Sequence, residues 1–254
     1  MRRVTVDRTS EDGVTLVRLT DPAAQNRLSE ALCEDLLQAL EAAARDKDLR
    51  VLVLAGSRET FCAGADLETL RQLSRGERAV KDMALPDRLL AFPLPIVAAL
   101  EGHAVGGGLA LALCCDVLVA ARSARYGVNF TDLGFPPGMG TMALLPAKVG
   151  HHFAAEMILT ARFWRGHELE GRGLFNHVEE ADRVLEVALQ VAGRMADKPR
   201  HVLELVKAAL ALPRRQALLA ASAREHLMHD LCFERPETLA RIESNYLSED
   251  KQEG

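Results

Sequence analysis

The chain has 254 residues, 48% of them hydrophobic and 26% charged, and its formal net charge is −5. These values fit a soluble globular protein and argue against nucleic acid as its main partner, because phosphate binding needs a positive field. No stretch approaches the roughly 18 consecutive apolar residues of a membrane span, and the N-terminus has no apolar signal segment. We therefore expect a cytoplasmic protein with no membrane partner.

The N-terminal elements alternate between strand and helix. Residues 4–9 and 13–20 have strand composition and are joined by the turn sequence SEDG, which predicts a hairpin. Residues 28–46 have apolar residues at helical spacing, with Ser29 as the capping residue. Residues 50–56 are a short apolar run, typical of a strand buried on both faces. This β–α–β order predicts an α/β fold with parallel strands.

The same order continues through the middle of the chain, and the C-terminal third is helical. Buried strands are expected at 93–102 and at 115–128, the second including its return. The first of them runs directly into a glycine turn that opens an apolar helix. The glycine turn and this helix together cover residues 103–115, and the helices predicted after them cover residues 139–160, 167–174, 181–197, 201–212, 214–231 and 235–247.

The cysteines suggest neither disulfides nor a metal site. They are odd in number and show no CxxC spacing, so buried thiols in a reducing compartment are expected. His226 and His229 stand three residues apart on a predicted helix, but no third ligand follows from spacing, so no metal is predicted. The cysteines are Cys33, Cys62, Cys114, Cys115 and Cys232.

Two turns between a strand and a helix carry the chemistry, at Phe61–Asp66 and Gly102–Gly108. A helix N-terminus exposes unpaired N–H groups, and glycine lets a ligand approach the backbone. If the turns are neighbours at the carboxyl edge of a parallel sheet, each can direct one N–H at the same oxygen and form an oxyanion hole. The alternative is that the glycine triplet only allows close packing of helix on strand.

Three segments resemble the crotonase (enoyl-CoA hydratase/isomerase) superfamily: FCAGADL, PLPIVAALEGHAVGGGLALALCCDVLVAARSARYG and LGFPPGMGTMALLPAKVG. The resemblance implies a ββα spiral core over residues 1–195 and a helical trimerisation region over 196–254. It also implies a homotrimer or hexamer, and an acyl thioester substrate carried on CoA or phosphopantetheine with no other cofactor. Ala65 and Gly107 would then supply the two oxyanion N–H groups, and Ala63, Gly64 and Asp66 would line the pantetheine passage.

Both carboxylates of the hydratases in this family are missing. The matching positions are Ala110, after the glycine triplet, and Phe130, in a motif resembling F-G-x-P-E. Hydration needs a positioned acid and base, so simple hydratase activity is not expected. A reaction that forms an enolate by losing CO₂ suits an apolar wall made by these two residues.

A closer resemblance is to the decarboxylases of polyketide β-branching cassettes, over residues 125–130, 133–140 and 229–237. It implies a glutaconyl-type substrate on an acyl carrier protein, with His229 as the proton donor and Asn129 as a polar neighbour of the substrate. One departure is Leu73, where some members carry a lysine for the substrate carboxylate. The substitutes considered are Arg71, Arg75 and Lys81, and helical phase favours none of them.

Two other readings stay open. Asp132 is the carboxylate nearest the second vacated position, so a double-bond isomerase that uses it is one alternative. The other is an inactive trimeric member that binds acyl groups. His103 lies within the glycine turn and is expected to be structural.

Overall fold

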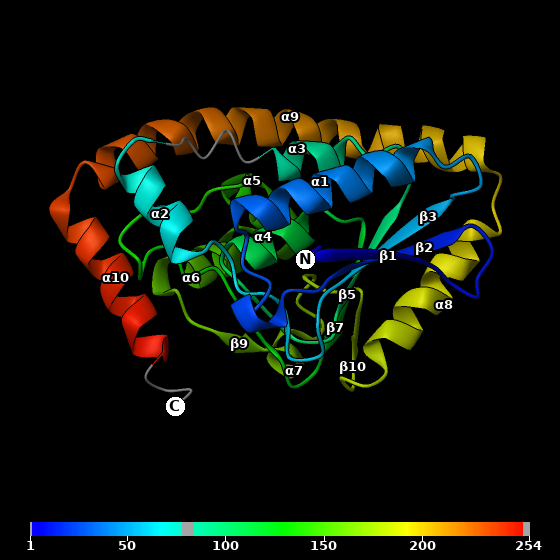
Figure 1. Cartoon of the computed structure of the whole chain (residues 1–254), viewed down its shortest axis with the longest axis horizontal. Helices are drawn as coiled ribbons and strands as arrows, with labels where there is room; N and C mark the ends of the chain where they lie inside the picture. The colour runs from blue at the N-terminus through cyan, green and yellow to red at the C-terminus, as the bar shows by residue number, and fades with distance from the viewer. Residues whose placement is uncertain (1, 78–83, 251–254) are drawn as a thin grey trace.

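The computed structural model describes residues 2–77 and 84–250 and shows an α/β fold with two sheets (Figure 1). The larger sheet has the strand order β1-β2-β3-β5-β7-β10. Its first two strands form the predicted antiparallel hairpin, and all the other neighbours are parallel. The strands are β1 Val4–Arg8, β2 Val14–Leu19, β3 Val51–Ala55, β5 Ile96–Leu100, β7 Val117–Ala121 and β10 His177–Glu179.

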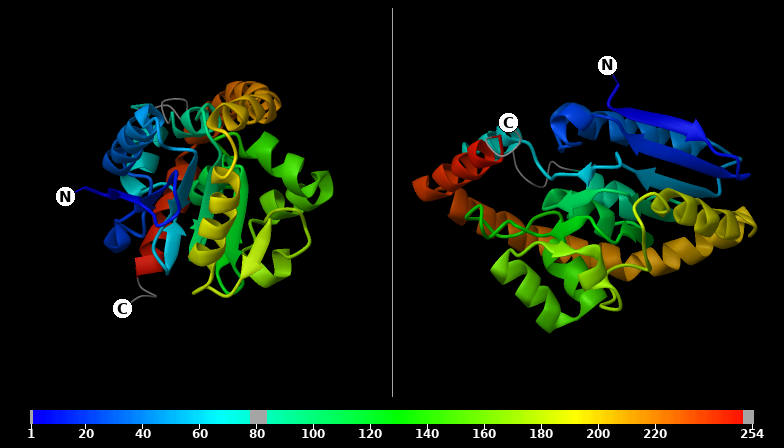
Figure 2. Two further views of the ribbon diagram at one scale, coloured as in Figure 1. Left: turned by 90° about the vertical axis from the view of Figure 1, so that its right-hand side faces the viewer. Right: turned by 90° about the horizontal axis from the view of Figure 1, so that it is seen from below.

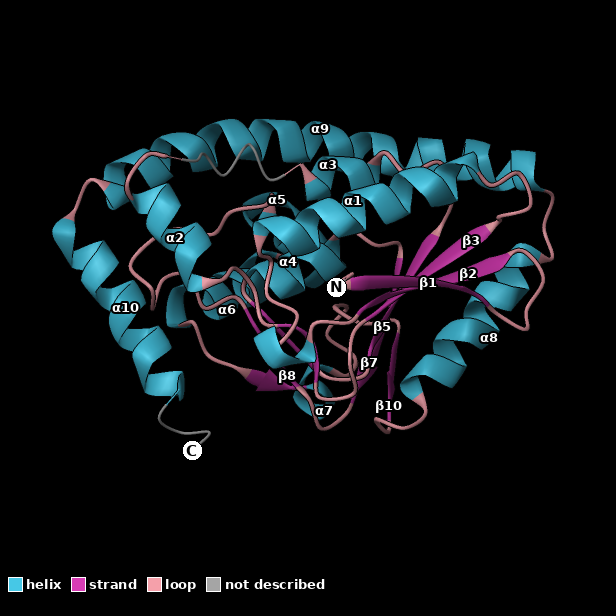
Figure 3. Cartoon of the chain, viewed as in Figure 1, coloured by secondary structure: helices cyan, strands magenta, loops and turns pink. Residues whose placement is uncertain are grey.

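Helices cover the central strands of this sheet. Every residue of β3 and β5 is buried, as expected for parallel strands with helices on their faces. Helix α8 packs against β3, β5 and β7, while α1 packs against β1 and β2, and the sheet fans out between them (Figure 3). Ser29 caps α1 as predicted, because its hydroxyl accepts the N–H of Leu32 at 3.2 Å.

The smaller sheet has the order β4-β6-β8-β9 and very short strands. Neither β9 nor β6 was expected, since no strand is predicted at 164–165 and the sequence predicts an unbroken passage from the strand at 93–102 into the glycine turn. Instead, a Cβ added to Gly102 would lie 2.2 Å from the carbonyl carbon of Glu59, so only glycine lets the chain cross there and begin a new strand. The strands are β4 Thr60–Cys62, β6 His103–Val105, β8 Arg125–Gly127 and β9 Trp164–Arg165.

The helices before residue 199 follow the prediction with three differences, the first being α3, which was not predicted. The helical stretch predicted at 139–160 is broken by Gly150, whose φ is +79°. The short helix predicted at 167–174 covers only Gly166–Leu169, because glycines with positive φ follow it. The helices are α1 Glu30–Arg45, α2 Leu67–Ser74, α3 Leu85–Leu90, α4 Gly107–Leu113, α5 Thr141–Val149, α6 His151–Thr160, α7 Gly166–Leu169 and α8 Val184–Ala196.

The C-terminal region consists of two helices, α9 Arg200–Phe233 and α10 Pro236–Asp250. The sequence predicts a break near Pro213, yet α9 continues through it. Lys207 and Arg214, on either side of the proline, both bind Asp116 of the core, at 2.7 Å and 3.1 Å, and this anchoring offsets the cost of a proline within a helix.

Helix α9 runs along one side of the molecule, and α10 turns back from its end (Figure 2). The boundary predicted between residues 195 and 196 lies at the last residues of α8, and both C-terminal helices pack on the rest of the chain. Within the described residues, no helix has the combination of length and apolarity that crossing a membrane requires.

Candidate active site

The two turns singled out in the sequence lie side by side. They follow β4 and β6, which are parallel neighbours in the smaller sheet. A Cβ added to Gly64 would lie 3.0 Å from the carbonyl oxygen of Val105 and 3.3 Å from the nitrogen of Gly107. Gly64 also has a φ of +87°, which favours glycine. The backbone of one turn therefore touches the backbone of the other at the carboxyl edge of the sheet.

Hydrogen bonds fix the orientation of the two candidate oxyanion N–H groups. The carbonyl of Gly64 accepts the N–H of Leu28 at 2.7 Å, and in a trans peptide the N–H of Ala65 then points the opposite way. In the same manner, the carbonyl of Gly106 accepts the N–H of Ala110 at 3.0 Å, so the N–H of Gly107 points out of the N-terminus of α4. None of the hydrogen bonds found among the described residues uses these two N–H groups.

The three glycines of the triplet 106–108 have different roles. Gly106 has a φ of +53°, and an added Cβ would lie 3.0 Å from the side-chain oxygen of Asn129. A Cβ on Gly108 would lie 2.0 Å from the carbonyl oxygen of Cys62, so this glycine serves close packing of α4 on β4. Gly107 instead borders the cavity. Packing and ligand approach, the two alternatives for the triplet, thus apply to different members of it.

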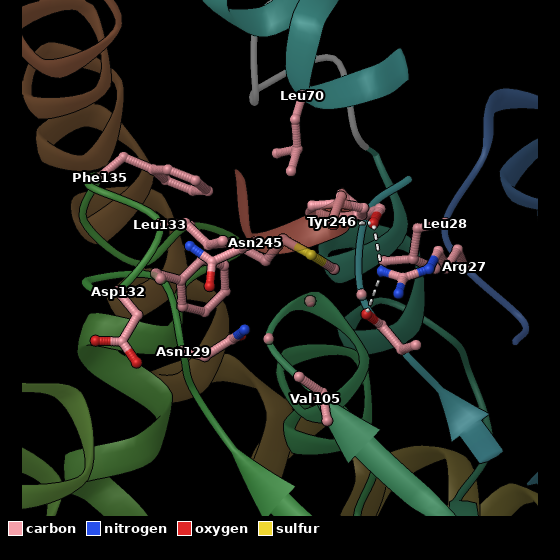
Figure 4. Close-up of a pocket in the computed structure, with 18 of the residues that line it drawn as sticks. Arg27, Leu28, Leu70, Val105, Asn129, Asp132, Leu133, Phe135, Asn245 and Tyr246 are labelled. Carbon is pink, nitrogen blue, oxygen red and sulfur yellow. Dashed lines mark hydrogen bonds between the residues drawn. The ribbon is translucent and has the colours of Figure 1, made fainter. Parts of the chain in front are cut away.

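A cavity of about 120 Å³ opens over the two turns (Figure 4). Its wall is mainly apolar, with leucine and phenylalanine side chains from α2 and from the segment 130–135. Seven of the residues predicted from the sequence line it: Ala63, Gly64, Ala65, Gly107, Asn129, Phe130 and His229. The structure brings these residues together from four distant parts of the chain, while their functional roles remain predictions.

Two predicted site residues lie outside the cavity lining. Asp66 caps α2, because its carboxylate accepts the N–H of Thr69 at 2.8 Å. Ala110 is fully buried in α4, on the side of that helix that packs in the core. The sequence gives their distance from the turns along the chain but not the direction in which each side chain points. Of the two apolar replacements, only Phe130 forms part of the cavity wall.

His229 is 3% exposed and lies on α9, with its ring stacked on Phe233. Its Nε2 lies 2.8 Å from the carbonyl oxygen of Pro136, which can only accept, so this nitrogen carries a proton. Its Nδ1 is buried and has no partner among the described residues. Burial lowers the pKa of His229 below 6.5, and the bond to Pro136 opposes this in part. The ring is therefore mainly neutral at neutral pH.

Glu225, one turn before His229 on α9, holds the same loop. It is 2% exposed, and one carboxylate oxygen accepts the N–H of Gly140 at 3.0 Å. Its other carboxylate oxygen is buried without a partner among the described atoms. Desolvation raises the pKa of Glu225 above 4.5. His229 and Glu225 thus fix the two ends of a loop that places Met139 in the cavity wall. Met139 has a φ of +59°.

Three residues of the cavity were not found from the sequence. Arg27 lies after β2, and its guanidinium donates to the carbonyl oxygens of Ala63 and Ala65 at 3.3 and 3.4 Å. Tyr246 of α10 places its ring 4.7 Å below this guanidinium and donates its hydroxyl to Ala65 at 2.6 Å. Asn245 lies beside it. No motif marks these residues, because Tyr246 and Asn245 reach the site through the folding of α10, and Arg27 through the pairing of Leu28 with Gly64.

Of the described cations considered in place of the lysine that some members carry, none lines the cavity. Leu73 lines the cavity with its apolar side chain. Arg71 points to α10, where its Nη2 binds Glu243 at 2.9 Å, and Arg75 at the end of α2 is not part of the lining. Lys81 lies outside the described residues. Among the described lining residues, Arg27 is the one lysine or arginine.

The residues of the alternative readings are also placed. Asp132 lines the cavity but is exposed, and its carboxylate points away from the centre in Figure 4. His103 lies in β6 outside this cavity, and its Nδ1 accepts the N–H of Arg125 at 3.0 Å. Burial raises the pKa of Cys62 to about 12, so this thiol beside the first turn is not a nucleophile at neutral pH.

The chain matches the family model described as enoyl-CoA hydratase/isomerase over residues 9–244. It is 33% identical over 236 residues to the bacillaene synthase decarboxylase PksI of Bacillus subtilis, a match that covers 93% of this chain and 95% of that protein. It is 38% identical over 227 residues to the 2,3-dehydroadipyl-CoA hydratase of Escherichia coli, which covers 86% of each.

Solved structures show the same relationships. One, from a dehydratase/decarboxylase enzyme couple involved in polyketide β-branching, superposes with a TM-score of 0.91 at 32% identity and covers 95% of this chain and 98% of that one. The ECH2 decarboxylase domain of CurF from Lyngbya majuscula superposes with a TM-score of 0.90 at 31% identity and covers 96% and 100%.

Proposed function

The chain belongs to the enoyl-CoA hydratase/isomerase family, and within it we propose a decarboxylase of a 3-methylglutaconyl-like thioester carried by an acyl carrier protein. The relatives with decarboxylase names support this reaction, although a CoA hydratase is similarly related. The observation that carries the proposal is the cavity wall. It presents a pair of backbone N–H groups at Ala65 and Gly107, and Phe130 where a hydratase of the family would place a carboxylate.

The reaction follows from this arrangement. The thioester oxygen accepts the N–H groups of Ala65 and Gly107. The bond to the terminal carboxyl carbon breaks, and its electron pair forms a new double bond to the β carbon. The former α,β pair then forms the double bond between the α carbon and the thioester carbon, and the carbonyl pair moves onto the thioester oxygen. The resulting dienolate is stabilised by the two N–H groups, each of which typically contributes about 10²–10³ in rate. One proton returns to the α carbon and completes the product, with CO₂ as the second product.

His229 supplies that proton in this proposal. Its Nε2–H is held by Pro136, so the proton delivered to carbon comes from Nδ1, the unpartnered atom, after this nitrogen takes up a proton from solvent. The lowered pKa makes the imidazolium a strong acid once it forms. Phe130 and Phe135 exclude water from this side of the cavity. No cofactor beyond the phosphopantetheine arm takes part.

We include a homotrimer or hexamer and a cytoplasmic location in the same proposal. Helix α9 exposes a row of large apolar side chains, of the kind that subunit contacts cover. The five cysteines are all free, which suits a reducing compartment. The exposed apolar residues of α9 are Val202, Leu205, Val206, Leu210, Leu212, Leu219, Leu227 and Leu231.

The test is to incubate the protein with a 3-methylglutaconyl carrier protein and to follow the acyl mass for loss of CO₂. His229→Ala is expected to slow product formation by about 10² or more while thioester binding changes little. His226→Ala, one turn away and partly exposed, is the matched control and is expected to leave the rate unchanged. Retention of CO₂ by every diacid thioester offered would overturn the decarboxylase.

A second candidate, the double-bond isomerase, is favoured by one observation: Asp132 lines the cavity. The same assay separates the two, since isomerisation leaves the acyl mass unchanged and shifts the alkene signals. If Asp132→Asn abolishes such a shift while no CO₂ is lost, the isomerase replaces the decarboxylase. If neither change occurs and the thioester still binds, the chain is an acyl-binding member without activity.

A further inference from the structure

A second, wider cavity of about 840 Å³ lies at the opposite edge of the smaller sheet. The first residues of three adjacent strands line it, namely Thr60 of β4, His103 of β6 and Arg125 of β8. The cavity of the candidate active site lies at the carboxyl ends of the same strands. The strands are only three residues long, so the distance from His103 to Gly107 along the chain is at most about 13 Å.

The two cavities share part of their walls. Arg27, Ala63, Val105 and Phe163 line both. Ala63 directly precedes the first oxyanion turn, and Val105 directly precedes the second. A flexible arm that enters through the wide cavity would therefore reach the paired N–H groups of the turns without crossing the core.

The rim of the wide cavity carries an unusual arrangement of positive charge. Arg125 of β8 and Arg165 of β9 stand directly opposite each other as cross-strand partners. Like charges in this relationship are destabilising. Both side chains are exposed, and neither has a carboxylate within 4 Å among the described residues, since the neighbouring Glu168 binds Arg162. Nη1 of Arg165 donates to the carbonyl oxygen of Ser123 at 2.6 Å, and among the described residues no carboxylate forms an ion pair with either guanidinium.

Arg58 adds to the positive charge at this rim, whereas His103 is a neutral ring. His103 accepts the backbone N–H of Arg125, and its pKa is lowered by burial and by the charges of Arg125 and Arg165. Arg58, exposed at the β4 side, lines the cavity and has no ion pair among the described side chains. Two carboxylates line the cavity, Glu101 and Glu59. Glu101 is neutralised by Arg18 at 2.9 Å, so Glu59 is the remaining negative charge in the described lining.

We propose that Arg125, Arg165 and Arg58 form the docking surface for an acidic carrier protein, whose phosphopantetheine arm enters through the wide cavity. The inference rests on the proposed function and names the partner of the same site. The net charge of the chain is −5, so the chain as a whole repels an acidic partner. A local group of unpaired arginines then decides where such a partner lands, and electrostatic complementarity of this kind governs association rate and orientation.

The experiment compares two substrates with the same acyl group, one on the carrier protein and one on free pantetheine. Arg125→Glu and Arg165→Glu are expected to raise KM for the carrier-bound substrate by about tenfold each and to leave KM for the pantetheine substrate unchanged. The control is Arg194→Glu, which makes the same charge change at an exposed position of α8. Added salt should raise KM of the wild type for the carrier-bound substrate and have less effect on the two variants.

A direct measurement of carrier binding keeps this test independent of the chemistry. If no substrate is turned over, the proposed function fails, and the Kd of the carrier protein for the three variants still decides the docking surface. Equal KM and Kd values for Arg125→Glu, Arg165→Glu and Arg194→Glu would overturn the inference. So would turnover of the CoA thioester alone, with no binding of the carrier.

Discussion

The hydroxyl of Tyr246 donates a 2.6 Å hydrogen bond to the carbonyl oxygen of Ala65, and this joins the C-terminal helix to the first oxyanion turn. The same carbonyl also accepts from Arg27, whose guanidinium lies over the Tyr246 ring. Since the peptide that follows Ala65 is held in this way, α10 contributes to the shape of the turn as well as to covering the cavity.

Tyr246→Phe should therefore weaken catalysis with little loss of fold. Removing one hydrogen bond costs about 1 kcal/mol, so kcat/KM is expected to fall by about three- to tenfold. Arg71→Gln is the matched control, because it breaks the contact between α2 and Glu243 of α10 without touching Ala65. Equal losses in both variants would show that the position of α10, and not the bond to the turn, matters.

Gly64→Ala should abolish most activity. The new Cβ would press on the backbone of the second turn, 3.3 Å from the nitrogen of Gly107, at a φ of +87°. Displacing one oxyanion donor typically costs about 10²–10³ in kcat. Gly171→Ala separates the effect of backbone strain from the effect of displacing the donor. Its φ of +75° brings the same backbone strain, but no atom lies within 4 Å of the new Cβ. Activity is expected to survive in that variant, and a comparable loss there would contradict the assignment.

Phe130→Glu tests the apolar wall of the cavity. A carboxylate there would repel the substrate carboxylate and hydrate the cavity, so decarboxylation, measured as CO₂ release, should fall by at least about tenfold. Phe130→Leu keeps the wall apolar and is expected to retain most of the rate. A Phe130→Glu variant as active as the wild type would mean that the wall plays no part in the reaction.

His229 should make the stability of the protein depend on pH. Its pKa in the folded chain is lowered, mainly by burial and further by His226, while Asp230 opposes the shift. A lowered folded pKa means that the unfolded chain binds the extra proton first. The contribution to stability is therefore complete above about pH 6.5, the value for an unfolded histidine, and is lost as the pH falls through the folded pKa.

The measurement is Tm between pH 8 and pH 5 for the wild type and for His229→Gln. The variant is expected to lose part of the decline in Tm at the acidic end. His226→Gln, whose side chain is partly exposed, provides the comparison. An identical decline in wild type and His229→Gln would contradict the buried neutral ring.

The candidate site was predictable where local sequence fixes local backbone. The turns at Phe61–Asp66 and Gly102–Gly108 each follow a strand and open a helix, and parallel strands have their carboxyl ends at one edge. Their adjacency followed from this order. The apolar residue at 130 was visible by comparison with the family motif. The hairpin, α1 with its Ser29 cap and the buried central strands follow from periodicity and capping for the same reason.

The tertiary structure alone decided which side chains face the cavity. Asp66 and Ala110 stand at the predicted spacing from the turns, yet one caps α2 and the other lies in the core, because a helix rotates each position by a fixed angle that the motif does not record. Arg27 and Tyr246 meet there across most of the chain length, a contact that no local pattern encodes.

The continuation of α9 through Pro213 also depends on contacts between distant parts of the chain. Local propensity favours a break, and anchoring of Lys207 and Arg214 on Asp116 overrides it. The sequence by itself thus determined the two neighbouring turns of the candidate site, through backbone rules that act within a few residues. Packing between distant elements determined the wall, the covering helix and the surroundings of His229.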